Sequence, residues 1–202
     1  PLIPPLPTAS DPAAAALAQK VAAHAGDPES VTELSFSFVV YDGSTEKARR
    51  RHVYRPKEGS LSVTSGESTV TMRGLTDVDP TPWVPSPKEH EDELLSIAPE
   101  TDAETAARAW SWWINDAYWL LMPSKVLDDG VFQTFDGDGR LVLTFLGVGL
   151  TPGDRYSLTV DAESGRVDEW LFELQGGNAG TFEWLDWARF GPLQLSTLRK
   201  ST

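Results

Sequence analysis

Residues 101–131 read TDAETAARAWSWWINDAYWLLMPSKVLDDGV, and this stretch decides which fold the chain can adopt. Thr101 and Glu104 have the spacing of a capping box, in which two side chains bond free backbone N–H groups at a helix start. Pro123 cannot continue a helix, because it lacks a backbone N–H and clashes with the preceding turn. The sequence therefore predicts one helix of about five or six turns that begins at Thr101 and ends at Pro123.

Apolar residues surround most of this predicted helix. At about 100° per residue, one broad stripe is made of Ala106, Ala107, Trp110, Trp113, Ile114, Ala117 and Leu121. Trp112 and Trp119 point the opposite way, with Asn115 and Asp116 beside them. A helix that is apolar on both sides is normally enclosed, so we expect this helix to be buried.

Alternation of apolar and polar residues predicts strands on both sides of the helix. Before it, a first helix from Ser10 or Asp11 to Gly26 is followed by strands at residues 31–40, 49–55, 60–64 and 69–73. After it come strands at residues 131–135, 141–145, 155–160, 166–174, 181–190 and 193–198. Short turns join nearly all neighbours, so the sheet should be antiparallel and, at this width, curled. The expected class is α+β.

The connection at residues 75–100 contains five prolines and one tryptophan, Trp83. A connection of this length is uncommon unless it covers something. Two interpretations remain open: Trp83 closes a lid over a cavity, or one buried tryptophan anchors a plain loop.

Charge and composition exclude several classes of partner. The 202 residues carry a formal net charge of −13, and residues 76–138 alone hold 14 acidic against 3 basic side chains. Nucleic acid is not an expected partner, because phosphate binding needs a basic surface. The basic residues from Lys47 to Lys57 either contact anionic headgroups or an acidic protein, or keep strand edges solvated. No transmembrane segment is expected, because no run of 18 apolar residues occurs.

The ends of the chain suggest how it is organised. Residues 1–10, PLIPPLPTAS, predict a proline-rich tether, and residues 11–202 predict a single domain. The first residue is Pro1 and not Met, so we expect a processed start from which a signal peptide was removed. A tether of this kind suits a secreted or lipid-anchored protein.

The sequence contains no set of residues that specifies a reaction. His24, His52 and His90 are isolated from one another and cysteine is absent, so neither a metal site nor a cofactor is expected. The motif G-x-S-x-G and a Gly-rich phosphate loop are also missing. Carboxylate pairs such as Asp168 with Glu169 fall on opposite sides of a strand, which is unsuited to joint acid and base work. We therefore predict that the protein is not an enzyme.

Asn115 and Asp116 are the polar residues that interrupt the apolar helix. A buried carboxylate must be paired, hydrogen-bonded or protonated, and Lys125, Arg140 or Arg155 are candidate partners for Asp116. Either the pair ties the helix to the sheet, or it is the polar anchor at one end of an apolar pocket.

Several segments together resemble a known family. They are WWINDAYWLLMP at 112–123, Lys125, Asp129-Gly130, GVGLTPGD at 147–154, and the hairpin from Val160-Asp161 to VDEW at 167–170. This pattern resembles a family of uncharacterised secreted bacterial proteins, which is similar in fold to the outer-membrane lipoprotein carriers LolA and LolB. The resemblance covers roughly residues 105–190. It implies a LolA-like incomplete barrel, a curled antiparallel sheet with helices packed on its concave face, and in the carriers that concave cavity holds acyl chains.

These expectations converge on a carrier-like protein that binds a lipid or lipoprotein in the periplasm, or tethered to the outer membrane from a point upstream of residue 1. The ligand would be a lipid or acyl chain in an apolar cavity between sheet and helices. The residues expected at that cavity are Trp83, Trp112, Trp113, Asn115, Asp116, Trp119, Phe145 and Trp170. The alternative is a non-enzymatic scaffold or interaction module whose core is filled by the tryptophans. A third hypothesis is a hydrolase that uses Asp116 with Asn115 or a nearby Ser or Tyr.

Overall fold

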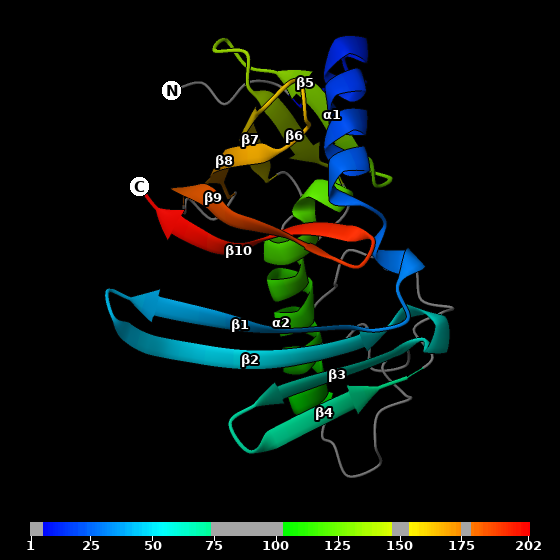
Figure 1. Ribbon diagram of the computed structural model, residues 1–202, viewed down its shortest axis with the longest axis vertical. Helices are drawn as coiled ribbons and strands as arrows, with labels where there is room; N and C mark the ends of the chain where they lie inside the picture. Colours follow the sequence, from blue (N-terminus) through cyan, green and yellow to red (C-terminus); the bar gives the residue numbers. More distant parts are fainter. Residues whose placement is uncertain (1–5, 74–102, 147–153, 175–178) are drawn as a thin grey trace. The chain divides into compact units, whose positions relative to one another are not determined.

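A computed structural model of the protein describes residues 6–73, 103–146, 154–174 and 179–202. In these residues two α-helices accompany ten strands, and the strands form two antiparallel sheets (Figure 1). The predicted α+β class is confirmed. The predictions made for Trp83, for the connection at 75–100, for the cap at Thr101 and for the start of the tether fall outside the described residues.

The chain divides into two compact units. One comprises Pro1–Asp27 with Leu120–Thr202, and the other comprises Pro28–Trp119. We call them the six-strand unit and the four-strand unit, after the sheet that each contains. That residues 11–202 form one domain stays a prediction.

The sheet of the four-strand unit is a meander of consecutive hairpins. Its strands pair in chain order: β1 (Leu34–Asp42), β2 (Thr45–Arg55), β3 (Ser60–Ser65) and β4 (Ser68–Met72). Gly43 and Gly66 lie in the first and last turns at φ of 59° and 60°, a backbone conformation that a residue with a Cβ resists. The predicted strands are confirmed, but β2 begins at Thr45 because its pairing with β1 continues to Asp42.

This sheet has one apolar and one polar face. Cross-strand pairing aligns Leu61 with Met72 and Val63 with Val70, and all four side chains are buried. On the other face the hydroxyls of Ser62 and Thr71, and of Thr64 and Thr69, are 2.9 Å apart in hydrogen bonds across the strands. The alternation of apolar and polar residues in the sequence therefore indicates a sheet with one face in the core.

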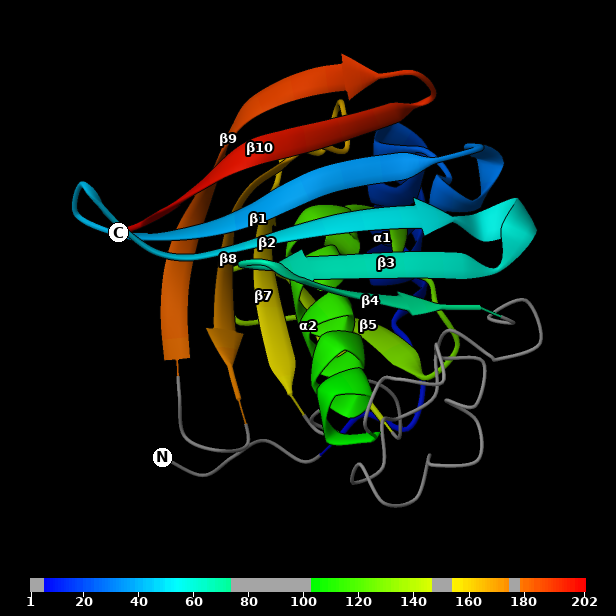
Figure 2. The same ribbon diagram turned by 90° about the horizontal axis from the view of Figure 1, so that it is seen from below.

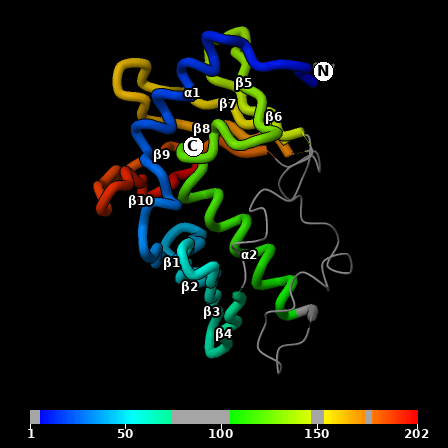
Figure 3. The backbone as a smooth tube through the Cα atoms, turned by 90° about the vertical axis from the view of Figure 1, so that its right-hand side faces the viewer, coloured from blue at the N-terminus to red at the C-terminus, as the bar shows by residue number. Residues whose placement is uncertain are grey.

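Helix α2 (Ala103–Leu121) runs along the apolar face of this sheet and crosses its strands (Figures 2 and 3). The Trp113 ring lies 6.1 Å from Phe36 and 5.0 Å from Tyr54, measured between ring centroids. The helix ends as predicted, with Pro123 inside the 3-10 turn η3 (Met122–Ser124). The predicted apolar stripe is confirmed by the buried residues Ala106, Ala107, Trp110, Trp113, Ala117 and Leu121, and only Ile114 is half-buried.

The six-strand unit contains an up-and-down antiparallel sheet. Its strands are β5 (Val131–Phe135), β6 (Leu141–Phe145), β7 (Arg155–Val160), β8 (Val167–Glu173), β9 (Ala179–Phe190) and β10 (Leu193–Ser201), and each pairs with the next along the chain. All six were expected from the alternation of residues. The last strand extends to Ser201, three residues beyond the predicted end, because β9 continues to pair with it.

Helix α1 (Pro12–Ala25) packs on this unit through small side chains. Asp11 caps it, because its carboxylate accepts from the backbone N–H groups of Ala13 and Ala14 at 2.8 and 3.0 Å. The β7–β8 turn approaches the helix so closely that a Cβ on Gly165 would lie 2.4 Å from the carbonyl oxygen of Lys20. Lys20 Nζ in turn donates to the carbonyl oxygen of Ala162 at 2.9 Å.

The sequence predicts one curled sheet, whereas the described strands form two. β4 and β5 are not paired with each other, and in the described residues neither sheet closes into a barrel. The physical reason is that alternation reveals strands and neighbouring hairpins, while β4 and β5 are separated in sequence by the whole of α2. Curling, and a position of the helices on a concave face, stay predictions.

Candidate functional site

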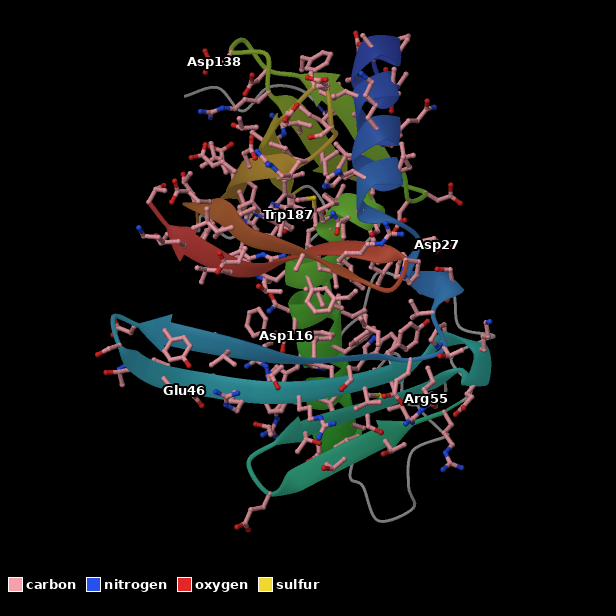
Figure 4. All side chains as sticks on the ribbon, viewed as in Figure 1. Asp27, Glu46, Arg55, Asp116, Asp138 and Trp187 are labelled. Atoms are coloured by element: carbon pink, nitrogen blue, oxygen red, sulfur yellow. The ribbon has the colours of Figure 1, made fainter. Side chains whose placement is uncertain are left out.

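Asp116 is the centre of a buried polar network in the four-strand unit (Figure 4). Its side chain has 0% solvent exposure. Arg50 donates to both carboxylate oxygens, from Nε to Oδ2 at 2.6 Å and from Nη2 to Oδ1 at 2.7 Å. His52 Nε2 lies 2.8 Å from Oδ2, and Asn115 Nδ2 donates to Oδ1 at 2.9 Å. Three protein side chains therefore bind this one carboxylate.

Strand alternation explains how these groups meet. Arg50 and His52 are two residues apart on β2, so both point to the face of the sheet along which α2 runs. Aromatic rings enclose them: Phe36 stacks on His52 at 4.9 Å, and the guanidinium of Arg50 lies 5.2 Å from the Phe38 ring and 5.4 Å from the Trp112 ring. The Arg50 side chain is only 15% exposed.

The network fixes the ionisation of Asp116. Burial raises the pKa of a carboxyl group, but the hydrogen bonds from His52, Arg50 and Asn115 and the charge of Arg50 outweigh it, so the Asp116 pKa lies below its ordinary value. An ionised carboxylate can only accept hydrogen bonds, so His52 Nε2 carries the hydrogen. Its other ring nitrogen, Nδ1, is buried and has no hydrogen-bond partner in the part of the chain that the structure describes.

The predicted partners of Asp116 are wrong. Lys125 pairs with Asp128 at 2.8 Å and Arg140 lies 3.9 Å from Glu169. The cation that pairs with Asp116 is Arg50, one of the basic residues between Lys47 and Lys57 that were expected either to contact an anionic partner or to keep strand edges solvated. Arg50 differs from its neighbours because alternation turns it inward. The geometry is that of a tie between α2 and the sheet, and the burial of Asp116 against a cation counts against a hydrolase built on it.

A surface pocket of about 620 Å³ adjoins this network. Its walls include Trp112 and four basic residues, Lys47, Arg49, Arg50 and Arg51. Most of that charge is already paired within the protein: Lys47 lies 3.6 Å from Asp42, and Arg49 lies 2.7 Å from Glu46. The residues that line the pocket are therefore mostly charged or polar, and most of their charges are paired, which differs from the apolar cavity expected at Trp112.

The other residues expected at an apolar cavity lie in both units. Trp113 and Trp119 belong to the four-strand unit, where Trp113 is buried and the Trp119 ring lies 6.4 Å from Phe38. Phe145 and Trp170 belong to the six-strand unit and are also buried. Trp83 falls outside the described residues. The predicted residues that the structure describes thus belong partly to one unit and partly to the other.

The six-strand unit carries an aromatic face that was not predicted from the sequence as one surface. It is made of Phe145, Tyr156, Trp170, Phe172, Phe182 and Trp184, from the neighbouring strands β6 to β9. Cross-strand register aligns Tyr156 with Phe172, and Trp170 with Phe182. Successive centroids are 5.3 Å apart for Phe145 and Tyr156, 5.2 Å for Tyr156 and Trp170, 5.2 Å for Trp170 and Trp184, and 6.0 Å for Phe172 and Phe182.

Gly180 makes room for part of this face. A Cβ at Gly180 would lie 2.9 Å from Phe172 Cζ and 3.1 Å from Phe182 Cε2. The absence of a side chain there lets the two phenylalanine rings stack at an interplanar angle of 16°. Burial within the face is uneven, because Trp170 and Trp184 are 1% and 2% exposed while Tyr156, Phe172 and Phe182 are half-buried.

Arg199 on β10 lies at the end of this face, a position that was not predicted from the sequence. Its Cζ atom lies 3.9 Å from the centroid of the Trp184 ring, and the two residues are partners across β9 and β10. The predicted strand ended at Leu198, so Arg199 was not assigned to either face of the sheet. A charged residue one position past an apolar strand was the signal that could have found it.

No protein-family model, curated protein or solved structure matches the chain. Among the residues described, no helix is both long enough and apolar enough to cross a membrane. The same residues contain no group of three or more His, Asp or Glu side chains placed to hold a metal ion. The chemistry of the described residues therefore carries the functional argument.

Proposed function

We propose that the protein binds a lipid or another ligand with an acyl chain on the aromatic face of its six-strand unit. The observation that carries this proposal is the contiguous set of six aromatic rings on neighbouring strands. Apolar surface of this kind, with a few polar groups beside it, is the usual composition of a site for an apolar ligand. Three of the rings are half-buried, so part of their surface is in reach of a ligand.

We further propose a carrier-like role in the periplasm or at the outer membrane, with the sheets curled into a LolA-like incomplete barrel. The support is the residue pattern quoted for the resemblance, together with antiparallel sheets and two helices in the described residues. Fold resemblance alone does not fix a function, so the ligand itself has to be measured.

The test combines recovery of a native ligand with binding of a neutral probe. Protein purified from a bacterial envelope is examined by native mass spectrometry and by lipid extraction, and the delipidated protein is titrated with the uncharged fluorescent probe N-phenyl-1-naphthylamine. We expect a co-purifying lipid and saturable enhancement of probe fluorescence. Absence of both would overturn the proposal.

A matched pair of variants locates the site. Phe172→Ala removes a half-buried ring from the aromatic face, and we expect it to weaken probe binding about five- to tenfold, as loss of a few contacting carbon atoms would. Phe190→Ala removes an equally large ring at an exposed position near the β9–β10 turn and should leave affinity within twofold. Equal effects of the two substitutions would place the probe elsewhere.

The scaffold hypothesis has one observation in its favour, the near-complete burial of Trp170 and Trp184. Rings buried to this degree can simply fill a core. In that case the protein binds no probe, and Phe172→Ala lowers only the free energy of unfolding.

A further inference from the structure

We infer that Arg199 binds the anionic head group of the ligand, so that the preferred ligand is an acyl chain ending in a carboxylate. This inference rests on the proposed function, because it places the charged end of the ligand beside the aromatic face that would hold the chain. It follows from the bonding of Arg199 and from a comparison with Arg50 in the same protein.

Arg199 has an unused hydrogen-bonding edge. A guanidinium has five N–H donors. Nη1 donates to the backbone carbonyl oxygen of Ser196, whereas Nε and Nη2 are shielded from solvent and have no hydrogen-bond partner among the residues that the structure describes. Buried charged groups are normally paired, so an unpaired edge of this kind indicates a missing anion.

The unused edge is the one that fits a carboxylate. Arg50 holds Asp116 through its Nε and Nη2 atoms, at 2.6 and 2.7 Å, which is the two-pronged geometry of an arginine and a carboxylate. In Arg199 the same two nitrogens have no partner in the described part of the chain. Arg50 therefore shows, within this chain, which group Arg199 lacks, and a ligand carboxylate would supply it.

The position of Arg199 is fixed, and it remains charged. Its guanidinium lies over the Trp184 ring at 3.9 Å, an attraction between a cation and an aromatic face that orients the free edge. Burial lowers the pKa of Arg199 to about 9, which still leaves the group cationic at neutral pH. Trp184 Nε1 is a second donor without a partner in the described residues. Arg199 and Trp184, at one end of the aromatic face, thus both carry N–H donors that have no acceptor among the described residues.

The experiment compares two ligands that share one chain. Oleate and oleyl alcohol each displace N-phenyl-1-naphthylamine from delipidated protein at pH 8, and the ratio of their affinities is the readout. We expect the protein to prefer oleate at least tenfold. Arg199→Met should reduce this preference to less than threefold while leaving affinity for the neutral probe within twofold. Lys200→Met removes the same charge from the neighbouring, exposed position and should keep the preference.

A measurement on the unaltered protein guards against a variant that fails to fold. The ionisation of oleate labelled with ¹³C at the carboxyl carbon can be followed by NMR. A carboxylate bound by Arg199 should titrate at least one pH unit below the carboxyl of oleate bound to the Arg199→Met variant. Oleate in neutral micelles is a second reference, and the same difference is expected from it. An unchanged titration, or an oleate preference that survives Arg199→Met, would overturn the inference. If the probe and oleyl alcohol bind but oleate is not preferred, only the head-group site is wrong. If no lipid co-purifies and the probe does not bind, the proposed function itself is refuted.

Discussion

Asp116 is ionised and has no solvent exposure, and its carboxylate is bonded by Arg50, His52 and Asn115. Replacing it by asparagine leaves the charge of Arg50 buried without a counter-ion. Breaking a buried pair in this way costs about 3–5 kcal/mol. We expect urea denaturation at pH 7 to show a loss of that size for Asp116→Asn. Asp138→Asn, at an exposed turn, should stay within about 0.5 kcal/mol of the wild type.

The double variant Arg50→Met with Asp116→Asn removes both charges. Its free energy of unfolding, compared with those of the single variants, separates the loss of the ion pair from the cost of leaving one charge buried and unpaired. Removing both charges should be less destabilising than the sum of the two single changes, because no buried charge is left unpaired. Additive losses would mean that the two residues act independently, and the tie between α2 and β2 would then not be the source of the stability.

The same network predicts how acid acts on the protein. The Asp116 pKa is lower in the folded chain than in the unfolded chain, so its contribution to stability is complete above the unfolded value of about 4 and is lost as the pH falls through the folded pKa. The free energy of unfolding, measured from pH 6 down to pH 3, should fall more steeply in the wild type than in Asp116→Asn. Parallel slopes would contradict the depressed pKa.

Arg199, unlike Asp116, is expected to lower the free energy of unfolding of the ligand-free protein. In the ligand-free protein its unpaired guanidinium is a buried charge without an anion, so Arg199→Met should raise the free energy of unfolding by about 1 kcal/mol. Adding oleate should raise the thermal midpoint of the wild type and have a smaller effect on the variant. A ligand-free variant that is less stable than the wild type would show that the stacking on Trp184 outweighs the cost of burial.

At the scale of elements, the docking of α1 depends on one glycine. Gly165 has a φ of 80°, and a Cβ there would overlap the backbone carbonyl of Lys20 in α1. We expect Gly165→Ala to lower the free energy of unfolding by at least about 3 kcal/mol, because backbone strain and steric overlap act together. Gly139 is the matched control, since its φ is 79° and nothing lies within 4 Å of its Cβ position. Gly139→Ala should lower the free energy of unfolding by about 1–2 kcal/mol. Equal losses in both variants would mean that the close contact at Gly165 does not affect stability.

The elements show which features the sequence could predict. The strands and their hairpins were predictable because alternation and turn residues are local signals, and the end of α2 was predictable from Pro123. The split into two sheets was not, since it depends on which distant strands pair. Arg50 was missed for a related reason: its charge suggested solvent, while the alternation of β2 turned it toward Asp116. The burial of Asp116 was predictable, but its partner was not, because 66 positions separate the two residues in the chain.

At the scale of the molecule, the two units are joined by the chain at two places. The first is the step from Asp27 to Pro28, and the second falls between Trp119 and Leu120, inside α2. A helix forms cooperatively, since each hydrogen bond depends on the turns beside it. Unfolding of the six-strand unit would release Leu121, which is 3% exposed, and would fray the end of the helix that carries Asp116. Loss of one unit should therefore weaken the other.

This connection leads us to expect a single unfolding transition for the whole protein. Asp116→Asn alters the four-strand unit and Gly165→Ala alters the six-strand unit, yet both should lower one common thermal midpoint. Hydrogen exchange followed by mass spectrometry resolves the units, because peptides from 34–72 and from 131–201 report on each sheet separately. In each variant we expect protection to fall in both sets of peptides, as it does in a single cooperative domain. Loss of protection confined to the substituted unit would show two domains that fold independently, and the single-domain prediction for residues 11–202 would then be wrong.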